Sequence, residues 1–302
     1  MIILTSIFLS SFLGTVLLTL PIKALAGAVG AMDLPDARKI HQIPTPRIGG
    51  IAFFLSFFLV SLWTATHSPS LHSQMMCAGA LTVALGVSDD IYSLSPYAKL
   101  FSQISIAFCA VSLGARATVI DLLIFRAELS PILSYVISIL FIVFLMNAFN
   151  FIDGMDGLAA SLASVSLFSL LVIMRSEQSA GVFLACALLG ALFGFFPFNM
   201  NRASVFMGDS GSNFLGLCLA CLSLRSFSGE IGAPLVLCLL VPMLDVVFAI
   251  TRRLLKGKNP FTADRGHIHH TLYDIGFSQN TVVFMMTLFA ICAATVGIIL
   301  KI

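Results

Sequence analysis

The sequence Asn147-Ala148-Phe149-Asn150-Phe151-Ile152-Asp153-Gly154-Met155-Asp156-Gly157-Leu158 joins two long apolar segments, residues 131–149 and 157–175. A helix that crosses a bilayer needs about 20 apolar residues, and both segments approach that length. The stretch between them holds two carboxylates and two amides. Ionisable groups beside hydrocarbon are costly, so we interpret these side chains as functional. This stretch predicts a helical membrane protein with a polar site at one edge.

The rest of the chain has the same character. Of its 302 residues, 59% are hydrophobic and only 10% are charged, whereas soluble domains carry about 25% charged residues. The mean hydropathy is +1.04. We therefore expect an all-α polytopic membrane protein, a single integral membrane domain over residues 1–302 with about ten transmembrane helices. The expected spans are 3–25, 48–66, 73–88, 98–115, 131–149, 157–175, 180–198, 211–227, 231–251 and 280–300.

Several other classes of protein are excluded or disfavoured. A net charge of +2 is too small to indicate nucleic-acid binding. The seven cysteines lie inside apolar spans and read as small hydrophobic residues, not as a disulfide framework. The first apolar run is longer than the core of a signal peptide and has no basic residue before it, so we expect a retained span.

Basic residues predict the orientation. With alternating loops, one side of the membrane receives most of them, including Lys23, Arg47, Lys99, Arg252 and Arg253. The other side receives fewer. The positive-inside rule makes the first side cytoplasmic, with both chain termini on the outside.

The acids and histidines were not used in that assignment, yet most of them fall on the same side. The predicted cytoplasmic side holds Asp89-Asp90, Lys99, Asn150 to Asp156, Asp209 and His267 to His270. We therefore expect these separate polar clusters to form one site at the cytoplasmic membrane surface.

The chemistry of the acid clusters points to a hard cation. Two adjacent carboxylates, Asp89 and Asp90, suit Mg²⁺, which prefers oxygen ligands. Asp153 and Asp156 are three residues apart and would share a face if that segment were helical; alternatively, one of them caps the next helix. Asp209, in Gly-Asp-Ser-Gly-Ser, is open to two readings: an ordinary N-cap, or part of a phosphate site at a helix N-terminus.

The remaining clusters are less specific. Three histidines, His267, His269 and His270, suit a transition metal, but the many acids favour Mg²⁺, so we expect these histidines to contact phosphate or substrate. Lys99 is a site residue or an interfacial lysine. The role of Asp245, an acid near the end of an apolar span, is left open.

Taken together, the motifs resemble the polyprenyl-phosphate N-acetylhexosamine-1-phosphate transferase family, in its WecA-like branch. That group is related to MraY, which makes the first lipid intermediate of peptidoglycan. The resemblance rests on the ordered set Asp-Asp, Asn-Phe-Ile-Asp-Gly-Met-Asp-Gly, Met-Gly-Asp-Ser-Gly-Ser and His-Ile-His-His, preceded by Pro46-Arg47-Ile48-Gly49-Gly50. The run 259–265, Asn-Pro-Phe-Thr-Ala-Asp-Arg, is similar to the WecA branch.

The resemblance implies a reaction and its setting. A UDP-N-acetylhexosamine, with N-acetylglucosamine as first choice, gives its sugar-1-phosphate to polyprenyl (undecaprenyl) phosphate and releases UMP. The cofactor is Mg²⁺, with Mn²⁺ as a substitute. The site faces the cytoplasm from a bacterial inner membrane, and the product begins a cell-envelope polysaccharide such as O-antigen lipopolysaccharide. A homodimer is left open.

The resemblance also implies roles for individual residues. Catalytic roles fall to Asp89, Asp90, Lys99, Asp153, His269 and His270; substrate binding falls to Asn150, Asp156, Phe206, Arg265 and His267; metal binding falls to Asp209, as principal ligand, and Asp153. A phosphomonoester is already largely a dianion at neutral pH. We therefore expect the Asp89-Asp90 pair to position the metal and Lys99, not to remove a proton. We also expect Asp153 to serve the nucleotide more than the metal.

Two alternatives compete with this reading. A UbiA-type Mg²⁺-dependent prenyltransferase also uses Asp-rich loops on a helical bundle, but it leaves the histidines unexplained. A secondary transporter would place its acids near the bilayer midplane, whereas here they gather at one predicted surface.

Overall fold

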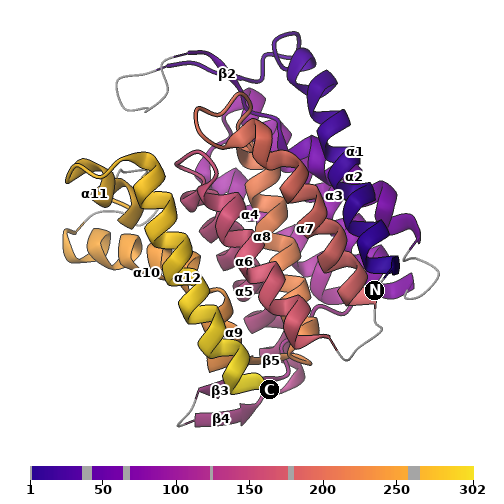
Figure 1. Ribbon diagram of the computed structural model, residues 1–302. Helices are drawn as coiled ribbons and strands as arrows, with labels where there is room; N and C mark the ends of the chain where they lie inside the picture. The colour runs from indigo at the N-terminus through magenta and orange to yellow at the C-terminus, as the bar shows by residue number, and fades with distance from the viewer. Residues whose placement is uncertain (1, 36–42, 64–68, 123–124, 176–179, 258–265) are drawn as a thin grey trace.

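The computed structural model describes residues 2–35, 43–63, 69–122, 125–175, 180–257 and 266–302, and it is dominated by helices (Figure 1). In chain order these are α1 (Ile2–Ala26), α2 (Gly50–Ser61), α3 (Pro69–Tyr92), α4 (Pro96–Ser112), α5 (Pro131–Ile152), α6 (Leu158–Ile173), α7 (Ala180–Asn199), α8 (Gly208–Ser226), α9 (Ala233–Cys238), α10 (Leu240–Leu255), α11 (Ile268–Asp274) and α12 (Gln279–Lys301).

The predicted class, an all-α polytopic membrane protein, is confirmed, whereas the count of ten spans is not. Within the described ranges, five helices are long and apolar enough to cross a membrane: α1, α3 from Leu71 onward, α5, α7 and α12. The shorter apolar helices include α2 and α6. Nine of the expected spans each coincide with one helix, although the bounds differ by several residues.

The expected span 231–251 is instead two helices, α9 and α10, which meet at Leu239. Pro242 has no N–H, so it cannot donate to the carbonyl of Cys238 one turn earlier. That carbonyl accepts a hydrogen bond from the hydroxyl of Ser166 on α6, at 2.8 Å. The proline explains the break, and Ser166 stabilises it.

Helix α8 is the centre of the bundle. It packs against α3, α5, α2 and α6, and almost all its residues are buried. A Cβ at Gly216 would lie 2.4 Å from the carbonyl oxygen of Leu145, so α8 and α5 touch backbone to backbone. Small residues allow such close approach between membrane helices. The first turn of α8 is thereby fixed relative to its neighbours.

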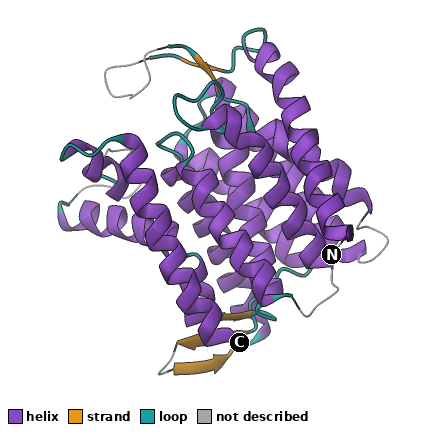
Figure 2. Cartoon of the chain, viewed as in Figure 1, coloured by secondary structure: helices purple, strands orange, loops and turns teal. Residues whose placement is uncertain are grey.

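Short strands lie at the two ends of the bundle, as Figure 2 shows. At one end, β3 (Val119–Leu122) pairs antiparallel with β4 (Phe125–Glu128) and parallel with β5 (Glu230–Gly232). We call this the sheet end; both chain termini lie towards it (Figure 1). At the opposite end, β1 (Met32–Asp33) pairs with β2 (Thr45–Pro46). The sequence did not predict these strands, which are two to four residues long.

Candidate active site

Lys99 joins three of the predicted polar clusters. It lies in the first turn of α4, which Ser95 caps by accepting a hydrogen bond from Ala98. Its Nζ is 3.0 Å from Asp89 Oδ2 and 3.0 Å from Asn150 Oδ1, and it also contacts the carboxylate of Asp209. Four helices, α3, α4, α5 and α8, thus contribute to one half-buried cluster. The expectation that these residues meet is confirmed.

Asp90 is the most enclosed acid of the Lys99 cluster, with 4% exposure. Its carboxylate accepts the backbone N–H groups of Asp209, at 3.0 Å, and Ser210, at 3.2 Å. Arg47 Nε donates to the same carboxylate at 3.0 Å. A carboxylate is favourable at a helix N-terminus, where the backbone N–H groups have no partner within the helix. Asp90 therefore fixes the first turn of α8.

Arg47 is a site residue that the sequence did not single out. It lies just before α2 and also approaches Asp33, at 3.7 Å. Burial alone would lower the pKa of Arg47, but the nearby carboxylates of Asp90, Asp209 and Asp33 outweigh it and raise the pKa. In the sequence, Arg47 belongs to the Pro-Arg-Ile-Gly-Gly run that precedes the acid motifs. Its positive charge was used only to predict which side of the membrane is cytoplasmic.

Two glycines make this close packing possible. Gly208 has φ +70°, and a Cβ there would lie 1.8 Å from the carbonyl oxygen of Arg47. A Cβ at Gly86 on α3 would lie 2.3 Å from the backbone of Ser210. Side chains at either position would push Arg47 or α3 away from the first turn of α8.

The structure rules out the N-cap interpretation of Asp209, while a phosphate site at this helix N-terminus stays a prediction. The N-cap position of α8 is Met207, and no side chain caps the helix. Asp209 lies in the first turn, and its carboxylate contacts Lys99 on another helix. Asp209 is therefore not an ordinary N-cap, and its side chain belongs to the cluster.

A chain of hydrogen-bonded amide side chains connects the cluster to the interior of the bundle. Gln103 is fully buried and donates to Asn213 Oδ1, while Asn147 donates to Gln103 Oε1, both at 2.8 Å. Asn213 Nδ2 in turn donates to the carbonyl oxygen of Asp209 at 2.8 Å. Asn150, which contacts Lys99, donates to Ser212 at 3.0 Å. Satisfied buried networks of this kind hold side chains in one arrangement.

Asp153 and Asp156 do not share a helix face, contrary to one of the two expectations. Helix α5 ends at Ile152 with Asp153 as its C-cap, and Gly157, at φ +74°, precedes α6. The capping alternative is also wrong, because the N-cap of α6 is Gly157 and it receives no side-chain hydrogen bond. Asp156 instead accepts the backbone N–H of Ala203 at 2.8 Å, so it holds the turn after α7.

Asp153 is a half-buried acid that lies near other acids. Within the described part of the chain its side chain makes no hydrogen bond or ion pair. Burial raises the pKa of Asp153 well above its ordinary value, and the nearby charges of Asp209, Asp90 and Asp156 raise it further. A carboxylate that is desolvated and close to other acids is stabilised by binding a cation or a proton.

Asp245 has a clear structural role that the sequence left open. Its carboxylate binds His267 Nδ1 at 2.7 Å and accepts the backbone N–H of Ile268, also at 2.7 Å. His269 Nδ1 lies 3.7 Å away. Asp245, from α10, therefore anchors the start of α11 and orients its first histidines.

The histidines pack against the turn that contains Asp153. A Cβ at Gly154 would lie 2.6 Å from His269 Nε2 and 3.2 Å from His270 Nε2. The rings of Phe151 and His267 have centroids 5.5 Å apart. His269 is fully buried, and neither ring nitrogen has a hydrogen-bond partner within the described residues. The second half of the predicted site thus adjoins the first through the Asp153 turn.

The structure does not test the predicted substrate contacts of Phe206 and Arg265. Phe206 is partly buried; its backbone N–H donates to Pro46 at 2.7 Å, and its carbonyl accepts from Gly49 at 3.0 Å. This pairing seats it beside the Arg47 segment, while its contact with a uracil stays a prediction. Arg265 lies outside the described residues.

The donor set fits Mg²⁺ better than a transition metal. Among the described residues there is no group of three or more His, Cys, Asp or Glu side chains arranged to hold an ion by themselves. Mg²⁺ does not require one, because it usually takes one or two carboxylates and completes its shell with water and phosphate. The carboxylates of Asp209 and Asp153 repel each other, Arg47 offsets only part of this repulsion, and among the described residues Asp153 forms no ion pair. An added hard cation would relieve that repulsion.

Comparison with known proteins identifies the family. The model of glycosyl transferase family 4 matches residues 73–227. A protein of Bacillus subtilis named as a probable undecaprenyl-phosphate N-acetylglucosaminyl 1-phosphate transferase is 33% identical over 97% of this chain and 84% of its own length. A decaprenyl-phosphate N-acetylglucosaminephosphotransferase of Mycobacterium tuberculosis is 33% identical over 89% of this chain and 75% of its own.

A third relative agrees. The undecaprenyl-phosphate alpha-N-acetylglucosaminyl 1-phosphate transferase of Pasteurella multocida is 33% identical over 96% of this chain and 84% of its own length. The family match includes Asp89, Lys99, Asp153 and Asp209, and these relatives extend it over most of the chain. The chain is a multi-pass membrane transferase and belongs to glycosyl transferase family 4.

Proposed function

We propose that this protein transfers N-acetylglucosamine-1-phosphate from UDP-N-acetylglucosamine to a polyprenyl phosphate, most simply undecaprenyl phosphate, and releases UMP. The names of its relatives support the acceptor and the transferred group. They also favour this reading over a prenyltransferase or a transporter. The observation that carries it is Lys99 held among Asp89, Asn150 and Asp209, close to the unpaired carboxylate of Asp153.

The reaction joins two anionic phosphates. An oxygen of the lipid phosphate forms a bond to the β-phosphorus of the UDP-sugar, and the bond from that phosphorus to the oxygen bridging the two phosphates breaks. UMP leaves with the bonding electrons. The lipid phosphomonoester has a second pKa near 6, so at neutral pH it already carries the charge needed for attack. A general base has little proton to remove.

The residues of the cluster would lower the repulsion between the reactants. Lys99 and Arg47 bring positive charge to the first turn of α8. His269 and His270 pack over the Asp153 turn, where they would contact the diphosphate or sugar. Asp209 and Asp153 are the residues that would hold Mg²⁺. When bound, this ion would neutralise phosphate charge and polarise the phosphoryl oxygens.

The setting is a second part of the proposal. The cluster lies at the end of the bundle opposite the sheet end, and the excess of basic residues in the loops on that side supports a cytoplasmic location. A UDP-sugar from the cytosol would then reach the site directly. We place the protein in the bacterial inner membrane, where its product would begin a cell-envelope polysaccharide.

The test is an assay of membranes that contain the protein, supplied with undecaprenyl phosphate, Mg²⁺ and one UDP-sugar at a time. UMP release and the mass of the lipid product are both scored. We expect UDP-N-acetylglucosamine to give the largest signal, abolished by Asp209→Asn. Asp121→Asn, at the sheet end, is the matched control and keeps the activity. Inorganic pyrophosphate in place of UMP, or no product from any sugar with folded protein, would refute the proposal.

A further inference from the structure

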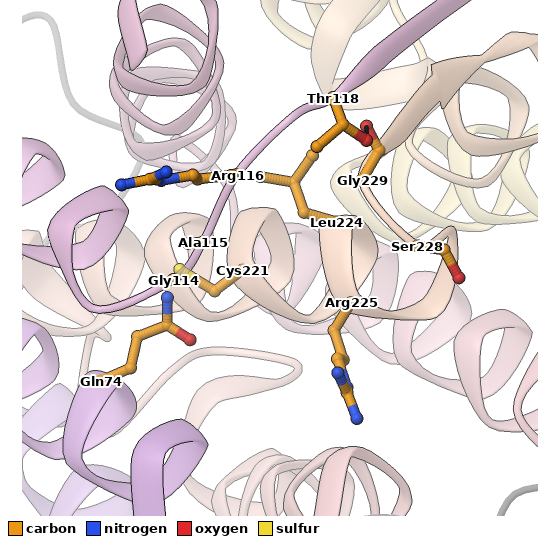
Figure 3. A pocket seen from close by; sticks show the side chains of 10 residues that line it. All are labelled: Gln74, Gly114, Ala115, Arg116, Thr118, Cys221, Leu224, Arg225, Ser228 and Gly229. Atoms are coloured by element: carbon orange, nitrogen blue, oxygen red, sulfur yellow. Dashed lines mark hydrogen bonds between the residues drawn. The ribbon is translucent and has the colours of Figure 1, made fainter. Parts of the chain in front are cut away.

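A polar cavity lies at the opposite end of the bundle from the Lys99 cluster. It has a volume of about 540 Å³ and is lined by residues that include Arg116, Arg225, Gln74, Thr118 and Ser228 (Figure 3). Thr118 and Gly229, both in its wall, connect it to the start of the β3–β5 pairing, so it belongs to the sheet end. Its volume is in the range of small-molecule sites, about 300–1,000 Å³.

No acidic partner of the two arginines of this cavity lies among the described residues. In the described part of the structure, neither Arg116 nor Arg225 forms an ion pair, and none of the lining residues is acidic. Arg116 donates to the Tyr135 hydroxyl and lies over that ring at 4.1 Å, which fixes its position without neutralising its charge. By contrast Arg126, at the same end, pairs with Asp121 at 2.9 Å.

The place of Arg225 in a helix can explain its own position but not the presence of two arginines in the cavity wall. It lies in the last turn of α8, where positive charge is favourable. That account does not extend to Arg116, which approaches the cavity from the segment between α4 and β3. Figure 3 shows the two side chains coming from separate segments of the chain and extending in different directions, and both line the cavity.

We propose that this cavity binds a phosphate-bearing headgroup. Guanidinium groups match phosphate oxygens in geometry and charge. The hydroxyls of Thr118 and Ser228 add further polar groups to the same wall, and the buried side chains of Cys221 and Leu224 complete it. Lipid headgroups and free phosphate share this chemistry. The site is separate from the Lys99 cluster, so it is a second anion site at the opposite end of the molecule.

The experiment uses the full-length protein in detergent with two probes, dioleoyl phosphatidic acid and inorganic phosphate. Phosphatidylcholine is the lipid control. Native mass spectrometry measures lipid binding, and thermal shift measures the effect of phosphate. Arg225→Gln is the main variant, because Arg225 is exposed and its replacement leaves the core intact. Arg126→Gln is the matched control, an arginine at the same end that does not line the cavity.

We expect the wild type to bind at least one phosphate probe in preference to phosphatidylcholine. Arg225→Gln weakens this binding roughly tenfold, the order of one charge-assisted hydrogen bond, while Arg126→Gln does not change it. Binding of phosphatidic acid alone identifies a lipid headgroup, and binding of inorganic phosphate identifies a free anion. Equal binding by wild type and Arg225→Gln, or no binding of either probe, would overturn the proposal. UMP release by Arg225→Gln stays at the wild-type level.

Discussion

The carboxylate of Asp90, at the end of α3, accepts the backbone N–H of Asp209, in the first turn of α8, at 3.0 Å. Asp90 thus binds the main chain of Asp209, while the side chain of Asp209 contacts Lys99. The two acids therefore have different contacts: Asp90 positions the first turn of α8, whereas the side chain of Asp209 contacts Lys99. The expectation that Asp90 acts through positioning agrees with this geometry, and its effect on the reaction stays a prediction.

The first prediction concerns Asp90→Asn. An amide has one oxygen and no charge, so it cannot serve Arg47 and both backbone N–H groups as the carboxylate does. We expect a loss of about 1.5–3 kcal/mol in the free energy of unfolding, together with a large loss of UMP release and a weaker response to Mg²⁺. Rescue of activity at higher pH with unchanged Mg²⁺ dependence would instead identify Asp90 as a general base.

Lys99→Met tests the ion-pair cluster. Removing the ammonium leaves Asp89 and Asp209 facing each other without their shared partner. Loss of one partner from a buried ion pair costs about 3–5 kcal/mol, which partial exposure of this cluster will reduce. We expect lower thermal stability and no measurable transfer. Lys99→Arg keeps the charge and serves as the matched variant; we expect it to recover stability but little activity. Full activity in Lys99→Met would contradict the assignment.

Asp153→Asn separates stability from function. Burial and neighbouring acids raise the pKa of Asp153 in the folded protein. At a pH above the ordinary pKa of an aspartate, the unfolded chain releases this proton more readily than the folded protein does, so Asp153 lowers the stability of the fold. In EDTA at neutral pH we therefore expect Asp153→Asn to have a higher melting temperature than wild type, yet far lower activity. We also expect added Mg²⁺ to stabilise the wild type more than the variant; an equal effect on both would support the expectation from the sequence that Asp153 serves the nucleotide more than the metal. A lower melting temperature in EDTA would mean that Asp153 has a stabilising partner.

Asp245→Asn tests whether the histidines are positioned from α10. The variant keeps one acceptor but loses the charge that pairs with His267, while Asp245→Ala also frees the N–H of Ile268. We expect graded losses in kcat/KM, larger for Ala than for Asn, with the KM for UDP-sugar more affected than the Mg²⁺ requirement. Similar kinetics for both variants and wild type would show that α11 holds its place without Asp245.

The sequence was sufficient for the membrane class, for most helices and for the meeting of the acid clusters, since intramembrane charge is rare and therefore informative. It was insufficient where partners are distant in the chain. The break at Leu239 depends on Pro242 and on Ser166 of another helix, and the role of Asp245 depends on a histidine 22 residues away. The site contacts of Arg47 and Gln103 were not predicted, because each is made with a residue distant in the chain, Arg47 with Asp90 and Gln103 with Asn213.

The most direct test of the account follows the β-phosphorus. Purified protein is given UDP-N-acetylglucosamine labelled with ³²P at the β-phosphate, together with undecaprenyl phosphate and Mg²⁺, and the lipid and aqueous phases are separated. We predict that the label enters the lipid in step with unlabelled UMP in the water, and that Asp209→Asn abolishes both. Label recovered in water as UDP would mean that the sugar moves without its phosphate, and the proposed reaction would be wrong.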